Sequence, residues 1–100
     1  MNEPIDIVIP EKIRPLIPKF LERTNASLEQ LRAALDSGDV RTLQDIGHRL
    51  KGTAGGYGFN HLGELAGKLE EAAKSGDAPS SAKLVAEMGD CLARAKIRYV

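Results

Sequence analysis

A histidine, a lysine and a glycine at fixed spacing are the residues of this sequence best suited to chemistry. His48 is followed by Lys51 and Gly52, and further glycines stand at positions 55, 56 and 58. The imidazole ring of histidine is mostly neutral and nucleophilic at pH 7. On a helix, a lysine three residues later adds a positive charge to the same side. Phosphoryl transfer depends mainly on positioning and charge stabilisation, so these residues are suited to it.

The helix that would carry His48 has its apolar stripe on the opposite side. At about 100° per residue, His48 points about 160° away from the centre of this stripe, into solvent. Gly52 and Gly55 lie on the His48 side, although an interior glycine costs about 1 kcal/mol relative to alanine. We therefore expect another molecule to come close to His48. The stripe itself consists of Leu43, Ile46, Leu50, Ala54 and Tyr57.

Polar residues of the same helix flank His48. Gln44, one turn earlier, is in position to hydrogen-bond a phosphate or the imidazole. Arg41 and Asp45 border the same face. Together with Gly52 and Gly55, they are expected to form the surface on which a partner docks.

The sequence predicts no metal, nucleotide or cofactor site. Two histidines and one cysteine are too few for the usual structural zinc site. The glycine segment is no P-loop, because no Gly-Lys-Ser or Gly-Lys-Thr ends it, and no dinucleotide fingerprint, because no strand precedes it. A metal-assisted enzyme that uses His48 and His61 is the weakest alternative, since no carboxylates join them at ligand spacing.

Composition restricts the class of protein. The chain has 100 residues, of which 42% are hydrophobic and 28% charged, as expected of one globular domain. The 14 basic and 14 acidic residues leave no net charge, which argues against nucleic-acid binding. No apolar run is long enough to span a membrane, and the start lacks the pattern of a signal peptide. The single Cys91, expected to be half-buried, fits a reducing compartment, so a cytoplasmic location is expected.

From residue 11 onward the apolar residues recur at helical spacing and predict four or five amphipathic helices. Residues 11–14 predict a separate turn, followed by residues 15–37 as one bent helix or two. Gly38 is expected to end this segment, Asp39 to cap the next helix and Asn60 to cap the third.

The last helix is expected to begin at Pro79 and the serines beside it, and to continue to the end of the chain. Its final turns would carry the cations Arg94, Lys96 and Arg98, which suit a helix C-terminus. Its apolar stripe consists of Leu84, Val85, Met88, Leu92, Ala95 and Tyr99.

The predicted fold is all-α: an up-and-down antiparallel four-helix bundle with an additional short N-terminal helix or tail. Residues 1–10 alternate like a short strand. No second strand-like run is evident to pair with them, so we interpret them as an extended tail or linker. Residues 11–100 are expected to form the bundle domain.

The residues around His48 resemble those of a known family. His48-Arg49-Leu50-Lys51-Gly52, with small residues after it and Gly58 closing the segment, is similar to the signature of histidine-containing phosphotransfer (HPt) domains. The resemblance covers roughly residues 13–77, and the last helix matches only by its periodicity.

The resemblance implies a phosphocarrier of two-component phosphorelays. It implies that His48 accepts a phosphoryl group on Nε2 from a receiver-domain aspartate and passes it to another, with Lys51 near the phosphoryl oxygens and Gly52 clearing space. The partners would be response-regulator receiver domains, for instance of a hybrid sensor kinase, and Mg²⁺ would be bound by the receiver only. The chain would be a monomer without ATP-dependent autokinase activity, and would bind neither nucleic acid nor membrane.

A second interpretation remains open. A helical adaptor without phosphorylation could keep the same bundle and dock a receiver or another signalling protein by shape alone. Such an adaptor would have no need of His48 and Lys51.

Overall fold

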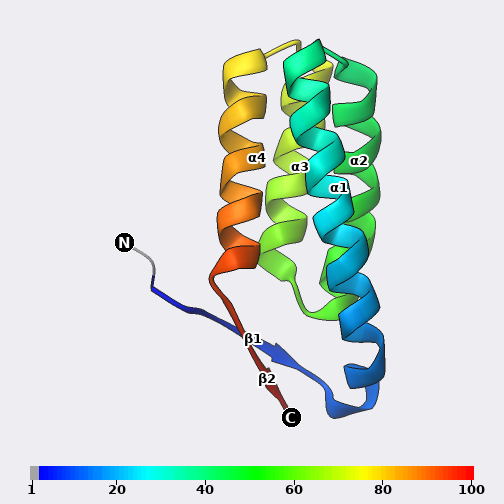
Figure 1. Ribbon diagram of the computed structural model, residues 1–100, viewed down its shortest axis with the longest axis vertical. Coiled ribbons are helices and arrows are strands. Elements are labelled where there is room, and N and C mark those ends of the chain that lie inside the picture. Colours follow the sequence, from blue (N-terminus) through cyan, green and yellow to red (C-terminus); the bar gives the residue numbers. More distant parts are fainter. Residues whose placement is uncertain (1–2) are drawn as a thin grey trace.

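The computed structural model describes residues 3–100, and its main feature is four helices packed side by side (Figure 1). Helices that follow each other in the chain run antiparallel, which confirms the predicted up-and-down bundle. None of the helices within the described residues is long and apolar enough to cross a membrane. The four helices are α1 (Ile17–Ser37), α2 (Val40–Thr53), α3 (Asn60–Lys74) and α4 (Ala78–Ala93).

The sharp turn between α1 and α2 follows from two adjacent residues. Gly38 adopts a φ of +70°, which glycine reaches without strain, and ends α1. The Asp39 carboxylate then accepts a hydrogen bond from the Thr42 backbone N–H at 3.1 Å and caps α2. Hydrogen bonds from the Thr42 side chain and backbone lower the pKa of Asp39. Both expectations for this turn are confirmed, and α1 is a single helix.

Two short 3-10 segments flank the helices. The first, η1 (Glu11–Leu16), contains the predicted turn, and α1 begins after it. The second, η2 (Ala54–Tyr57), follows α2 where the glycines cluster. The prediction that Asn60 caps the third helix is wrong: Asn60 is the first residue of α3, and Phe59 occupies the cap position without a side-chain bond.

The chain ends in a strand, which the sequence reading missed. Strand β2 (Ala95–Tyr99) pairs in parallel with β1 (Ile5–Ile9), with Ile7 opposite Ile97. The predicted continuation of the last helix to Tyr99 is therefore wrong, and so is the expectation that residues 5–9 lack a partner strand. Arg94 is instead the C-cap of α4. Lys96 and Arg98 lie on a strand, not in a helical turn.

Burial explains why β2 is a strand. The spacing of residues 92, 95 and 99 fits a helix, but residues 95, 97 and 99 equally fit a strand with one apolar face. Ile7 and Ile9 of β1 belong to the hydrophobic core, and β2 provides hydrogen-bond partners for the backbone groups of β1. Pairing thus lets β1 bury its isoleucines while the backbone groups on the edge that faces β2 are hydrogen-bonded.

The strand pair packs onto one end of the bundle (Figure 1). That end contains an aromatic cluster, in which the rings of Phe20 and Tyr57 stack at 4.5 Å and Phe20 lies 5.1 Å from Phe59. The guanidinium of Arg14 lies 4.3 Å above the ring of Tyr99 and joins η1 to β2. The boundary predicted between residues 1–10 and 11–100 stays a prediction.

Candidate functional site

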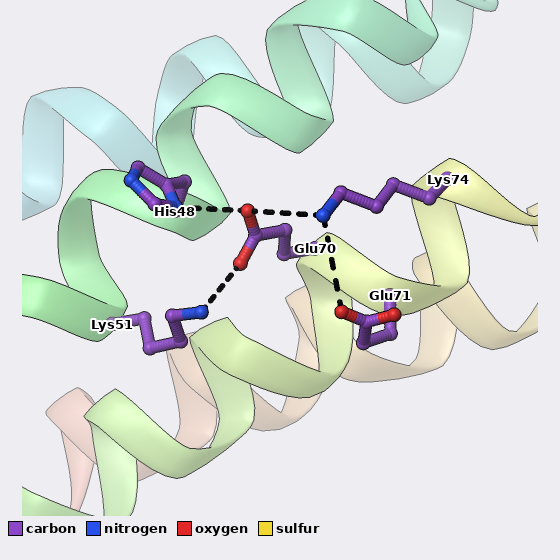
Figure 2. Close-up of polar contacts among 5 residues, drawn as sticks. All are labelled: His48, Lys51, Glu70, Glu71 and Lys74. Atoms are coloured by element: carbon purple, nitrogen blue, oxygen red, sulfur yellow. Dashed lines mark hydrogen bonds and ion pairs between the residues drawn. The ribbon is translucent and has the colours of Figure 1, made fainter.

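His48 lies on α2 and joins it to α3 through Glu70. Its side chain is 70% exposed, in agreement with the helix phase expected from sequence. Its Nδ1 atom nevertheless lies 2.8 Å from the Glu70 carboxylate oxygen Oε2, as Figure 2 shows. The Glu70 side chain is only 6% exposed. One ring nitrogen of His48 is thus held by a buried carboxylate.

Two lysines complete the surroundings of Glu70 (Figure 2). The ammonium of Lys51 lies 2.9 Å from Oε1, and that of Lys74 lies 3.7 Å from Oε2. Oε1 is closed to solvent and accepts no hydrogen bond of good geometry, so Lys51 compensates it as an ion pair. Lys51, and then the hydrogen bond from His48, hold the pKa of Glu70 below its ordinary value. Glu70 in turn raises the pKa of Lys51.

This arrangement fixes the tautomer of neutral His48. An ionised carboxylate can only accept hydrogen bonds. Because the Glu70 carboxylate lies against Nδ1, the Nδ1–H form of the ring is the one that it stabilises. Nε2 then carries the free lone pair of a largely exposed ring. When the ring is neutral, the site therefore offers a nucleophile at Nε2, with the Glu70 carboxylate on the opposite side of the ring.

Missing side chains let α2 and α3 approach each other at the site. A Cβ atom on Gly47 would lie 3.0 Å from the Ala66 carbonyl oxygen and 3.1 Å from the Glu70 nitrogen. A Cβ atom on Gly67 would lie 3.1 Å from the Cδ atom of Lys51. Gly47 thus brings the backbone of Glu70 close to His48, and Gly67 leaves room for the Lys51 stem. These contacts give the two glycines a structural role that the sequence pattern did not assign.

The other predicted site residues lie around this cluster without joining it. Gln44 is half-buried, and its side chain forms no hydrogen bond within residues 3–100. Arg41 and Asp45 are exposed and form an ion pair at 3.8 Å. Gly52 faces open space, and Gly55 is exposed in η2. Of the predicted residues, the structure therefore brings together His48 and Lys51.

Two further candidates weighed from the sequence stay apart from the cluster. His61 is exposed at the start of α3 and forms no hydrogen bond or ion pair within the described residues. Those residues also contain no group of three or more side chains that could hold a metal ion. Cys91 is more buried than expected, and burial raises the pKa of its thiol.

Glu70 is the site residue that sequence reasoning missed. A signal for it exists in the printed sequence. Glu70 shares one face of α3 with small residues, Gly63, Ala66 and Gly67, much as His48 stands among glycines. A charged side chain beside small residues at the flank of an apolar stripe is rarely buried unless it is paired. The pairing itself depends on how α3 packs on α2, which a single helical pattern does not give.

A groove of about 610 Å³ lies between α1 and α2, beside the residue that follows His48. Its apolar lining includes Phe20, Leu50 and Tyr57. Three cations, Lys19, Arg23 and Arg49, also line it, and no carboxylate does. Phe20 and Tyr57, whose rings stack on each other, line the groove where η2 meets α1. Positive charge therefore gathers on the α1 side of His48, whereas Lys51 and Lys74 on the α3 side are paired with Glu70 and Glu71.

Comparison with known proteins gives one family. The family model described as "Hpt domain" matches residues 15–97, which is most of the chain. No curated protein and no solved structure matches the chain. The matched range contains all four helices and the whole cluster around Glu70.

Proposed function

The chain belongs to the Hpt domain family, whose members act as phosphotransfer modules in phosphorelays, and we propose that it carries the phosphoryl group on His48. One observation supports this most: the exposed imidazole is held through Nδ1 by buried Glu70, which leaves Nε2 free. No other histidine within residues 3–100 has such a partner, since His61 forms no ion pair.

The proposed step is an exchange of one bond to phosphorus for another. The Nε2 lone pair of neutral His48 attacks the phosphorus of an aspartyl phosphate on a receiver domain. The N–P bond forms while the P–O bond to the aspartate breaks, and the aspartate leaves as a carboxylate. The same exchange in reverse passes the phosphoryl group to the aspartate of another receiver.

Glu70 acts on the charge that develops during this step. As Nε2 bonds to phosphorus, the ring retains its Nδ1 proton and becomes positively charged. The carboxylate 2.8 Å from Nδ1 stabilises that charge and holds the ring in place. Because Glu70 is buried and already paired, little reorganisation is needed when the charge appears. Glu70 is therefore a positioning and charge-stabilising residue that does not touch the phosphoryl group.

Lys51 and Gly52 have proposed roles on the phosphoryl side. The Lys51 stem lies along Gly67, and its ammonium can rotate from Glu70 toward phosphoryl oxygens beyond His48. Open space at Gly52 leaves room for the receiver. Gln44 would hydrogen-bond the phosphoryl group only after its side chain turns, because it has no bond to His48 in this structure.

The proposed partners are response-regulator receiver domains, which approach His48 over α2. Arg41, Asp45, Gly52 and Gly55 are the surface residues proposed to border the contact. A receiver presents an acidic phosphorylation site, and Mg²⁺ would be bound there. The cations Lys19, Arg23 and Arg49 of the groove beside α2 attract such a surface although the chain has no net charge, so association should weaken as salt is added.

We further propose that the chain does not phosphorylate itself from ATP. The glycine segment after Lys51 forms the end of α2 and the short η2, and a helix rather than a strand leads directly into it. It thus lacks the strand–loop–helix arrangement of a nucleotide-binding P-loop.

Transfer from a phosphorylated receiver domain, followed by intact mass spectrometry at neutral pH, tests the proposal. We expect wild type and the control His61→Gln to gain one phosphoryl group, and His48→Gln to gain none. Glu70→Gln should accept the group more slowly while keeping the helical content of wild type. Uptake by His48→Gln equal to that of wild type would place the acceptor elsewhere. If wild type and the variants all bind the receiver and none of them accepts the phosphoryl group, the result would favour an adaptor.

A further inference from the structure

The outer edge of β2 is an unpaired strand edge. The Ile5 N–H donates to the Arg94 carbonyl, and the Val100 N–H donates to the Ile9 carbonyl. In a parallel pair this register turns the peptide groups of residues 94, 96, 98 and 100 toward β1. Those of Ala95, Ile97 and Tyr99 point the other way, and they form no backbone hydrogen bond within residues 3–100. Such an edge is a template for one more strand.

The outer edge of β1 is less accessible. A Cβ atom on Gly58 would lie 3.3 Å from the Val8 carbonyl oxygen and 3.0 Å from Ile9. The turn between η2 and α3 therefore lies against that edge. A hollow of about 530 Å³ lies at the start of the strand pair, lined by Pro4 beside β1, Ala95 and Lys96 of β2, and Asp90, Ala93 and Arg94 at the end of α4. The β2 edge, whose outward peptide groups have no backbone partner within residues 3–100, is therefore the edge open to an added strand.

Charge argues against a second copy of the chain as the occupant. Lys96 and Arg98 are exposed on the outer face of β2, and Ile97 and Tyr99 are half-buried on the inner face. If two copies of β2 paired antiparallel about Ile97, Lys96 of each copy would stand opposite Arg98 of the other. Like charges directly opposite each other destabilise a strand pair.

The sequence of β1 shows which kind of strand pairs with β2. It alternates isoleucine with Asp6 and Val8, and the register places Asp6 opposite Lys96. The isoleucines face the core while Asp6 is exposed. A strand on the other side of β2 would meet the same row of cations and the same half-buried apolar face.

From this we propose that the free edge of β2 binds an extended segment of a partner protein in which acidic and apolar residues alternate. Backbone bonds to Ala95, Ile97 and Tyr99 would provide affinity, and carboxylates beside Lys96 and Arg98 would provide selectivity. The edge lies on the strand pair at the end of the bundle, so this binding goes beyond the proposed phosphotransfer and does not depend on it (Figure 1).

A synthetic peptide of alternating valine and aspartate, matched in length to β2, is the probe. Titrated into the full chain and followed by NMR, it should shift the amide signals of Ile97 and Tyr99 and slow their hydrogen exchange. A peptide of alternating valine and lysine should bind weakly or not at all. Arg98→Glu should weaken binding of the acidic peptide at least about threefold, because an attraction across the strands becomes a repulsion. Lys83→Glu makes the same charge change at an exposed position of α4, away from β2, and should leave binding unchanged.

Arg98 stands opposite Val8, so its replacement removes no ion pair within the strand pair. Circular dichroism of Arg98→Glu should therefore match that of wild type. The proposal would be overturned by no shift at millimolar peptide, by equal binding of the acidic and basic peptides, or by shifts confined to other elements. A dimer of the chain alone that Arg98→Glu alters would identify a second copy as the occupant and would also overturn it. His48→Gln should bind the peptide like wild type, which separates this test from that of phosphotransfer.

Discussion

Replacing Gly47 by alanine should destabilise the chain, although alanine is the better helix former. The new Cβ would lie 3.0 Å from a backbone oxygen and 3.1 Å from a backbone nitrogen of α3. Backbone does not yield as a flexible side chain does, so α2 and α3 must move apart by a few tenths of an ångström. Overpacking of this kind costs about 1–3 kcal/mol. Alanine is favoured over glycine in a helix by about 1 kcal/mol, which offsets part of this cost. The free energy of unfolding should therefore fall by about 0–2 kcal/mol.

The same substitution at Gly52 is the matched control. Gly52 lies on the same helix and faces open space. Gly52→Ala should therefore raise the free energy of unfolding by about 0.5–1 kcal/mol. For a domain of this size the two variants should differ in Tm by at least about 2 °C, with Gly47→Ala the lower.

Urea and thermal unfolding, followed by circular dichroism, measure this difference. Gly47→Ala should also accept the phosphoryl group more slowly, because the separation of the helices lengthens the contact between His48 and Glu70. A Gly47→Ala variant as stable as Gly52→Ala would refute the reasoning. It would mean that the approach of α2 and α3 at Gly47 is not tight.

Three further predictions follow from burial and charge. Lys51 lowers the pKa of Glu70 below its ordinary value of 4.5, so stability from the ionised carboxylate is present above that pH and is lost as pH falls through the lowered folded-state value. In urea titrations, the stability difference between wild type and Glu70→Gln should shrink in that acidic window; a constant difference would contradict this. Cys91 is buried with a raised thiol pKa, so a thiol reagent should modify the folded chain far more slowly than the unfolded chain; equal rates would contradict its burial. Ile9→Ala should cost about 2–5 kcal/mol of unfolding free energy and Val8→Ala, at an exposed position, less than about 0.5 kcal/mol; an Ile9→Ala variant as stable as wild type would show that β1 is not part of the fold.

The features that the sequence predicts well are local ones. Apolar residues at helical spacing identify the four helices, and Gly38 with Asp39 identifies the turn between the first two. The exposure of His48 also follows from the phase of one helix. Each of these depends on neighbours within a few residues along the chain.

The features that the sequence reading missed depend on contacts between distant segments. β2 fits both a helical and a strand pattern, and its pairing with β1 at the other end of the chain decides between them. The small residues around Glu70 on α3 are visible in the sequence, but its partner His48 is known only once α3 is packed on α2. Gly47, likewise, acquires its role only when α3 packs against it.

The contacts that pack α2 against α3 also position the residues of the site. Gly47 sets how closely Glu70 approaches α2, Glu70 determines which nitrogen of His48 is free, and Gly67 gives room to the stem of Lys51. A change in any of these contacts should therefore affect phosphotransfer even though none of the three residues would touch the receiver aspartate.

The most direct test of the central claim is the position of the phosphoryl group on the ring. The chain, labelled with ¹⁵N at its histidines, would receive the group from a phosphorylated receiver domain and be examined by NMR for coupling between phosphorus and nitrogen. We predict coupling to Nε2 of His48 while its Nδ1 keeps a proton bonded to Glu70. Coupling to Nδ1, or to either nitrogen of His61, would contradict the account.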